Sequence, residues 1–178
     1  RRWIDVAEAL AATPWRAPVL TANLLASVGG TLANAGFGAR SIRAGCQIDH
    51  VERLRLVDPG GRVREVRPSD PGFALALGAL GQAGLVSEAT LRLAPRPPAS
   101  TLHRKVWAGL DDMVADLREL AVLAAAERPD SFYVFIDRDQ LHRRRPLYGI
   151  FGIDDGTGGD GARPPAGAEP VAECADSD

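Results

Sequence analysis

Apolar residues recur at helical spacing in two stretches of the chain. In residues 3–12 the side chains of Trp3, Val6, Ala7 and Leu10 share one face. Residues 111–127 carry a second apolar stripe, which consists of Met113, Leu117, Leu120, Leu123 and Ala124. Such periodicity predicts two amphipathic helices. Prolines at 14 and 18 predict that the first helix ends before them.

Shorter apolar runs between turn residues predict β-strands. Residues 51–57 and 62–66 flank the sequence Asp-Pro-Gly-Gly, in which proline fixes φ and glycine permits positive φ, and the pair therefore predicts a hairpin. Further strands are expected at residues 85–93, 101–107, 131–136 and 147–153. Asp70 and Pro71 are suitable for the N-cap and first position of a short helix.

Proline-rich residues 92–100 predict a domain boundary. We expect one domain over residues 1–97 and the start of a second over residues 98–153, which opens as strand, helix and strand. If those two strands pair in parallel, their connection must be right-handed. Residues 154–178 are rich in Gly, Pro, Ala and Asp, and a disordered tail is expected there.

Composition and charge exclude several classes of protein. The formal net charge of the 178 residues is −2, so no basic balance indicates a nucleic-acid partner. No apolar run reaches the length of a membrane span, and a soluble protein is expected, with the cytoplasm favoured as its location. Cys46 and Cys174 lie far apart and predict two unpaired thiols. Neither a catalytic triad order nor metal-ligand spacing occurs, so no metal site is expected.

Two glycine-rich segments carry the most information about function. Residues 27–36 read Ser-Val-Gly-Gly-Thr-Leu-Ala-Asn-Ala-Gly. A Gly-Gly pair allows close approach to the backbone and can cradle negative charge, although a simple tight turn is the alternative. Gly78, Gly81 and Gly84 then predict a short glycine-rich helix that runs into the strand at 85–93. Glycines at this spacing are costly in a helix, which indicates that something approaches the backbone closely.

In this order the segments resemble the flavin domain of the vanillyl-alcohol oxidase / p-cresol methylhydroxylase family, and within it the cytokinin dehydrogenase-like proteins. The matching landmarks are Trp3–Val6, Ser27–Gly36, Arg43–Gly45, Gln47–Ile48, the predicted hairpin, Gly78–Val86 and Leu93–Pro95. The resemblance implies an α+β fold: the C-terminal half of a PCMH-type FAD-binding domain, followed by the start of an α+β substrate domain.

The same resemblance implies FAD as cofactor and assigns residues to it. Gly29 and Gly30 would lie against the pyrophosphate or the ring system, and Ser27 would hydrogen-bond the cofactor. The polar side chains of Thr31 and Asn34 either cap the following turn or bond the cofactor.

Four further positions fall where the family contacts FAD. Ala33 can offer only its backbone. The ring of Phe37 either packs on the cofactor or belongs to the core. Leu85 and Val86 would offer backbone groups on the adenosine side, which is compatible with the buried start of a strand.

The resemblance also implies an activity, with one departure. The family oxidises small organic substrates by hydride transfer to flavin N5. Ala22 stands where cytokinin dehydrogenases carry a catalytic Asp, and alanine cannot act as a base. No catalytic residue is therefore assigned. We expect a partial chain of a FAD-dependent oxidoreductase; the alternative is a non-catalytic remnant or partner subunit that needs a complementary chain.

Overall fold

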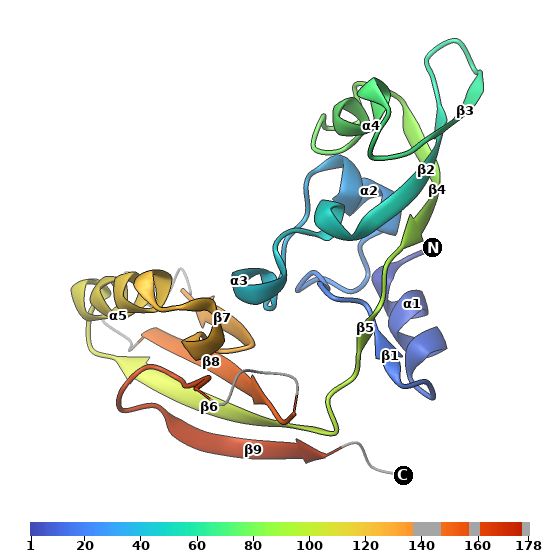
Figure 1. The fold of residues 1–178 in the computed structure, drawn as a ribbon. Coiled ribbons are helices and arrows are strands. Elements are labelled where there is room, and N and C mark those ends of the chain that lie inside the picture. Colours follow the sequence, from blue (N-terminus) through green and yellow to red (C-terminus); the bar gives the residue numbers. More distant parts are fainter. Residues whose placement is uncertain (137–146, 157–160, 176–178) are drawn as a thin grey trace. The chain divides into compact units, whose positions relative to one another are not determined.

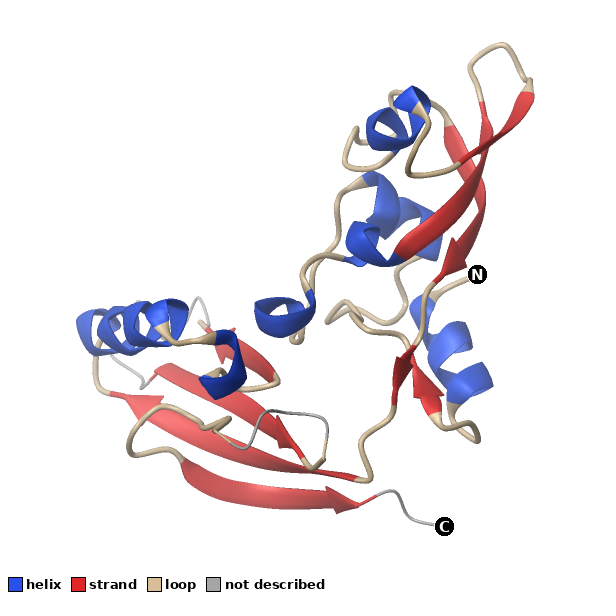
Figure 2. Cartoon of the chain, viewed as in Figure 1, coloured by secondary structure: helices blue, strands red, loops and turns tan. Residues whose placement is uncertain are grey.

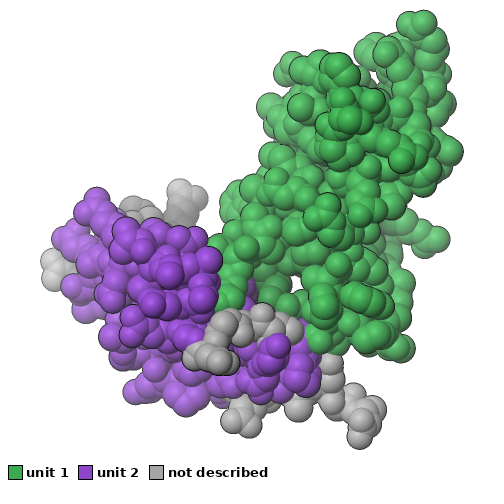
Figure 3. All heavy atoms as spheres, viewed as in Figure 1, with its two compact units in different colours: residues 1–96 green, residues 97–178 purple. Residues whose placement is uncertain are grey.

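The computed structural model describes residues 1–136, 147–156 and 161–175. The chain forms two compact units, residues 1–96 and residues 97–178 (Figures 1 and 3). The division between residues 96 and 97 falls within the proline-rich segment 92–100. Within the described residues, no helix is long and apolar enough to cross a bilayer.

Unit 1, residues 1–96, is built on a three-stranded antiparallel sheet of order β3-β2-β4. Its strands are β2 (Val51–Val57), β3 (Val63–Val66) and β4 (Leu85–Leu91). Two short strands, β1 (Trp15–Arg16) and β5 (Ala94–Pro95), pair separately. The helical elements are α1 (Trp3–Leu10), α2 (Val28–Ala33), α3 (Ser41–Ala44), the 3-10 turn η1 (Gln47–His50) and α4 (Pro71–Ala76).

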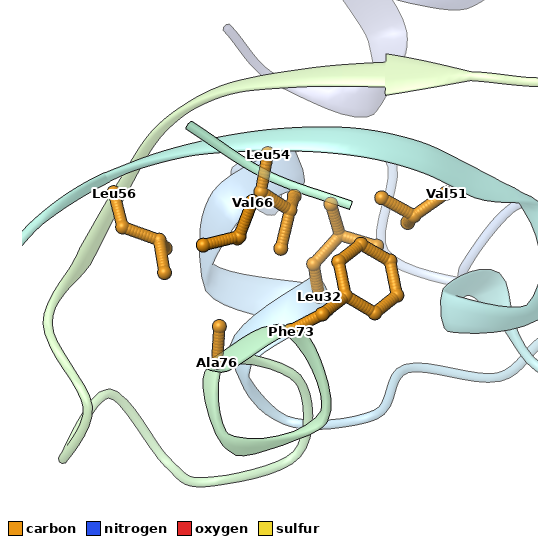
Figure 4. Close-up of a cluster of buried hydrophobic side chains, with 7 residues drawn as sticks. All are labelled: Leu32, Val51, Leu54, Leu56, Val66, Phe73 and Ala76. Carbon is orange, nitrogen blue, oxygen red and sulfur yellow. The ribbon is translucent and has the colours of Figure 1, made fainter. Parts of the chain in front are cut away.

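Helices α2 and α4 cover one face of this sheet and enclose the core of unit 1 with it (Figure 4). Leu54 and Leu56 alternate along β2 and point toward the helices, as the pleat of a strand requires, and a register shift between Val51 and Arg53 places Val51 on the same side. The buried side chains are Leu32, Val51, Leu54, Leu56, Val66, Phe73 and Ala76. The predicted hairpin is therefore present, with its apolar side against α2.

The glycine-rich segment before β4 is not a helix, so that prediction is wrong. Helix α4 ends at Ala76, and Gly78, Gly81 and Gly84 have φ of 75°, 79° and 133°. A right-handed helix requires negative φ at every residue, so these glycines form a loop of left-handed turns. This loop, residues 77–84, is called the glycine loop below.

Unit 2, residues 97–178, has a four-stranded antiparallel sheet of order β7-β8-β6-β9. Its elements are β6 (Ala99–Trp107), α5 (Leu110–Val122), the 3-10 turn η2 (Ala125–Glu127), β7 (Ser131–Phe135), β8 (Leu147–Asp154) and β9 (Glu169–Ala175). Helix α5 packs on one face (Figure 2). The buried core there consists of Trp107, Met113, Leu120, Leu147 and Phe151.

Strands β6 and β7 are not neighbours in the sheet, because β8 lies between them and pairs antiparallel with both. The expectation of a disordered tail is wrong for part of the tail: Glu169–Ala175 forms β9, which pairs with β6. Composition misled here because a strand at a sheet edge is held by backbone hydrogen bonds, which do not require large apolar side chains. Residues 157–160 and 176–178 of the expected tail lie outside the described residues.

Candidate cofactor site

A pocket of about 780 Å³ opens in unit 1 where α2, the glycine loop and β4 come together. Most of the site residues expected from the sequence line it, namely Ser27, Gly29, Gly30, Ala33, Asn34, Leu85 and Val86. They come from segments more than fifty residues apart in the sequence. The two expected residues that do not line the pocket are Thr31 and Phe37.

Local hydrogen bonds hold the start of α2 at the pocket. The hydroxyl of Ser27 accepts the N–H of Gly30 at 3.2 Å and so caps the helix. The backbone N–H of Val28 donates to the carbonyl of Arg1 at 3.1 Å. The side-chain amide of Asn34 donates to the carbonyl of Gly30 at 2.8 Å. Ser27, Gly30 and Asn34 are all exposed and line the pocket, so their remaining hydrogen-bonding capacity is accessible there.

The glycine pair has a structural reason within the chain itself. A Cβ on Gly29 would lie 2.9 Å from the carbonyl oxygen of Val86, closer than real Cβ atoms approach. A Cβ on Gly30 would lie 2.7 Å from the capping hydroxyl of Ser27. The close approach that the sequence indicated is therefore, for Gly29, the contact between α2 and β4 that forms the floor of the pocket.

Thr31 faces the interior. Its hydroxyl accepts the indole N–H of Trp3 at 2.7 Å and donates to the carbonyl of Val28 at 3.1 Å. Trp3 is 1% exposed, so this bond ties α1 to α2 inside unit 1. Of the two alternatives for Thr31, these contacts favour a structural role.

Replacing Thr31 by valine tests that role. The change keeps the shape and leaves the buried indole N–H of Trp3 without its acceptor, so we expect a loss of about 1–2 kcal/mol in the free energy of unfolding. Urea unfolding followed by circular dichroism measures it, and Thr31→Ser, which keeps the hydroxyl, serves as control. FAD binding stays unchanged in both variants if Thr31 is structural; a loss of binding at wild-type stability would contradict this.

Phe37 is 73% exposed, so the alternative that its ring belongs to the core is wrong. It does not line the pocket, and its expected contact with the cofactor stays a prediction. It belongs to a loop whose Gly38 packs directly against the carbonyl of Leu20. Ala22, in the neighbouring loop, is exposed, and the side chain of Asn23 accepts the N–H of Leu25 at 3.1 Å in a local turn. Neither Ala22 nor Asn23 offers a group that takes up a proton.

Side chains from the β3-β2-β4 sheet form one wall of the pocket, and the sequence did not predict this wall. Arg53 and Arg55 of β2, Glu65 of β3 and Glu88 of β4 line the pocket. The detectable signal was the alternation of charged and apolar residues along the hairpin, which places these side chains on the face opposite the core. That a pocket borders this face could not be predicted from the alternation.

The charged side chains of this wall form two ion pairs. Arg53 pairs with Glu65 at 3.0 Å and Arg55 pairs with Glu88 at 2.5 Å. A hydrogen bond from Arg67 and the nearby charge of Arg53 lower the pKa of Glu65, outweighing the opposing effect of desolvation. The carboxylate therefore stays ionised, bound to arginine, and is poorly suited to act as a base at neutral pH. Within the described ranges, no group of three or more His, Cys, Asp or Glu residues could hold a metal ion.

The residues present fit a dinucleotide cofactor. The pocket volume lies in the range of small-molecule sites. Its lining includes the small residues Gly29, Gly30, Ala33, Gly81 and Gly84, whose side chains take up little of the pocket. Exposed leucines at 80 and 85 supply apolar surface for a ring, while the side chains of Ser27 and Asn34 supply polar groups.

Comparison with known proteins agrees with this chemistry. Residues 1–67 match the FAD binding domain family. An uncharacterized oxidoreductase, ORF5 in the fasciation locus of Rhodococcoides fascians, is 34% identical over 117 residues, which are 65% of this chain and 27% of that protein. Cytokinin dehydrogenase 10 of Oryza sativa subsp. japonica is 38% identical over 97 residues, or 53% of this chain and 18% of that enzyme. Cytokinin dehydrogenase 6 of the same plant is 30% identical over 164 residues, which are 85% of this chain and 30% of that enzyme.

The chain thus spans between 18% and 30% of the length of these relatives. The matched FAD binding domain region includes α2 and the hairpin that borders the pocket. The family match implies FAD as the cofactor. Residues 1–67 thus match a FAD binding domain, and parts of the chain are similar to cytokinin dehydrogenases and to an uncharacterized oxidoreductase.

Proposed function

We propose that this chain is part of a FAD-dependent oxidoreductase and that the pocket of unit 1 holds a portion of the cofactor. The observation that carries the proposal is the convergence of the glycine pair of α2, the glycine loop and the start of β4 on one pocket. When bound, FAD supplies the hydride acceptor for the oxidation of a small organic substrate. Unit 2 is proposed to begin the substrate domain.

Each pocket residue has a distinct task in this proposal. Gly29 lets α2 lie against β4, and Gly30 lets the hydroxyl of Ser27 cap the start of α2 beside the pocket. Ser27 and Asn34 hydrogen-bond polar parts of the cofactor, while Leu85 and Val86 offer backbone groups at the start of β4. No residue of the pocket is assigned as the base, because both carboxylates of the wall are paired with arginines.

Retention of flavin tests the proposal directly. The purified chain is incubated with FAD, free cofactor is removed by gel filtration, and the visible spectrum is recorded. We expect the wild-type chain to retain the flavin absorbance. Ser87→Trp, which places a large ring at an exposed pocket position of β4, is expected to lose it. The matched control is Val63→Trp, on an exposed position of β3 outside the pocket.

A specific observation favours a second candidate, a subunit that needs a complementary chain. Among the described residues, no strand pairs with the outer edge of β4 in the β3-β2-β4 sheet, and the pocket runs along all residues of β4. An unpaired edge beside a cofactor pocket is a place where another segment can add a strand. A colourless wild-type chain that becomes yellow only after the remaining portions of the Rhodococcoides fascians relative are added would favour this candidate. A chain that is yellow by itself would exclude it.

A further inference from the structure

Leu80 combines an unusual backbone conformation with an unusual position. Its φ is 53°, in the left-handed region that leucine rarely adopts. Its neighbours Gly78 and Gly81 have similar φ of 75° and 79°, but glycine adopts such angles without strain. Leucine at this position therefore carries a conformational cost.

The backbone hydrogen bonds of the glycine loop do not require leucine. The N–H of Leu80 donates to the carbonyl of Ala33 at 2.8 Å, and the N–H of Gly78 donates to the carbonyl of Leu32 at 3.2 Å. These bonds satisfy two carbonyls at the C-terminal end of α2 and fix the loop conformation. A glycine at position 80 would make the same bond without the strain.

Packing within the described chain does not require leucine either. The side chain of Leu80 is 69% exposed and is absent from the core cluster of unit 1. It lines the pocket, together with Ala33 at the end of α2 and Leu85 at the start of β4. A strained, exposed leucine gains little from burial in this chain, so its benefit comes from what occupies the pocket.

We propose that Leu80 is a positioning residue, whose side chain forms an apolar lip of the pocket and packs against bound FAD. The inference rests on the proposed cofactor site. The strain at Leu80 is offset only when the apolar surface of the side chain is covered by the ligand. The ligand-free protein therefore carries a local instability that cofactor binding relieves.

Three variants separate the backbone from the side chain. Leu80→Gly removes both the strain and the apolar lip, so we expect the melting temperature without FAD to rise by about 2–4 °C and the dissociation constant for FAD to rise roughly tenfold. Leu80→Ala keeps the left-handed residue, so its affinity falls similarly without any gain in melting temperature. Leu75→Ala, at an exposed position of α4 outside the pocket, is the control and changes neither quantity.

Differential scanning fluorimetry of the FAD-free chain and titration of flavin fluorescence supply the two measurements. A lower melting temperature for Leu80→Gly would show that the side chain stabilises the chain itself and would overturn the inference. Unchanged FAD affinity in both Leu80 variants would overturn it as well, while the proposed function would stand. A wild-type chain that binds no FAD, either alone or with the remaining portions of the Rhodococcoides fascians relative added, would overturn both.

Discussion

Replacing Gly84 by alanine is expected to lower the free energy of unfolding of unit 1 by about 3–4 kcal/mol and to abolish FAD retention. Two causes add at this position. Its φ of 133° lies in a region that residues with a Cβ avoid. An added Cβ would also lie 2.5 Å from the carbonyl oxygen of Val57, a backbone atom that cannot move without displacing β2.

Gly81 provides the matched control for this prediction. It belongs to the same loop and lines the same pocket, and its φ is 79°, but a Cβ there would have nothing within 4 Å. Gly81→Ala should therefore cost only the conformational strain, about 1 kcal/mol. Urea unfolding of both variants, followed by circular dichroism, gives the comparison. Equal losses would mean that the contact with Val57 does not constrain the loop.

The second large effect is expected in unit 2, where Phe151→Ala should cost about 3–5 kcal/mol. Phe151 is fully buried at the centre of the sheet. The centroid of its ring lies 6.0 Å from the ring centroid of Phe132, with the two rings stacked. It lies 6.2 Å from the ring centroid of Trp107, with the two rings edge to face. The substitution removes both ring contacts and leaves a cavity that the surrounding strands cannot fill.

Hydrogen exchange measured by mass spectrometry locates this loss. Faster exchange in β6, β7 and β8, with unchanged exchange in β2 and β4, is the expected result, because residues 1–96 and 97–178 form separate compact units. The control is Val122→Ala at the end of α5, where the side chain is 82% exposed. Equal acceleration in both units would show that they unfold as one.

The sequence predicts the elements whose local chemistry is complete within a few residues. The hairpin is an example: the side chain of Asp58 accepts the N–H groups of Gly60 and Arg62 at 2.9 Å, as a turn residue should. The apolar stripe of α5 similarly places Met113 and Leu120 in the core. The predicted cofactor residues of α2 and β4 lie close together. Their proximity could be predicted only from the resemblance to a family, because their spacing along the chain does not indicate it.

Long-range features escape such reasoning. Strand β9 depends on the free edge of β6, some seventy residues earlier, and nothing in its own composition marks it as a strand. The glycine loop was misread because spacing alone cannot distinguish a glycine in a helix from one at positive φ. The strain at Leu80 could not be predicted either, because leucine is a good helix former and its presence does not indicate a left-handed turn.

The connections of α2 determine when its pocket can form during folding. The helix has only six residues, fewer than an isolated helix needs to persist in water. Its C-terminal end is held by the glycine loop and its first turn contacts β4, both about fifty residues later in the sequence. Because these distant segments must meet before α2 is stable, we expect the pocket to be among the last parts of unit 1 to assemble and the first to open. Occupancy of the pocket would then slow the opening of the whole unit, and the lifetime of the folded state would depend on the concentration of its ligand.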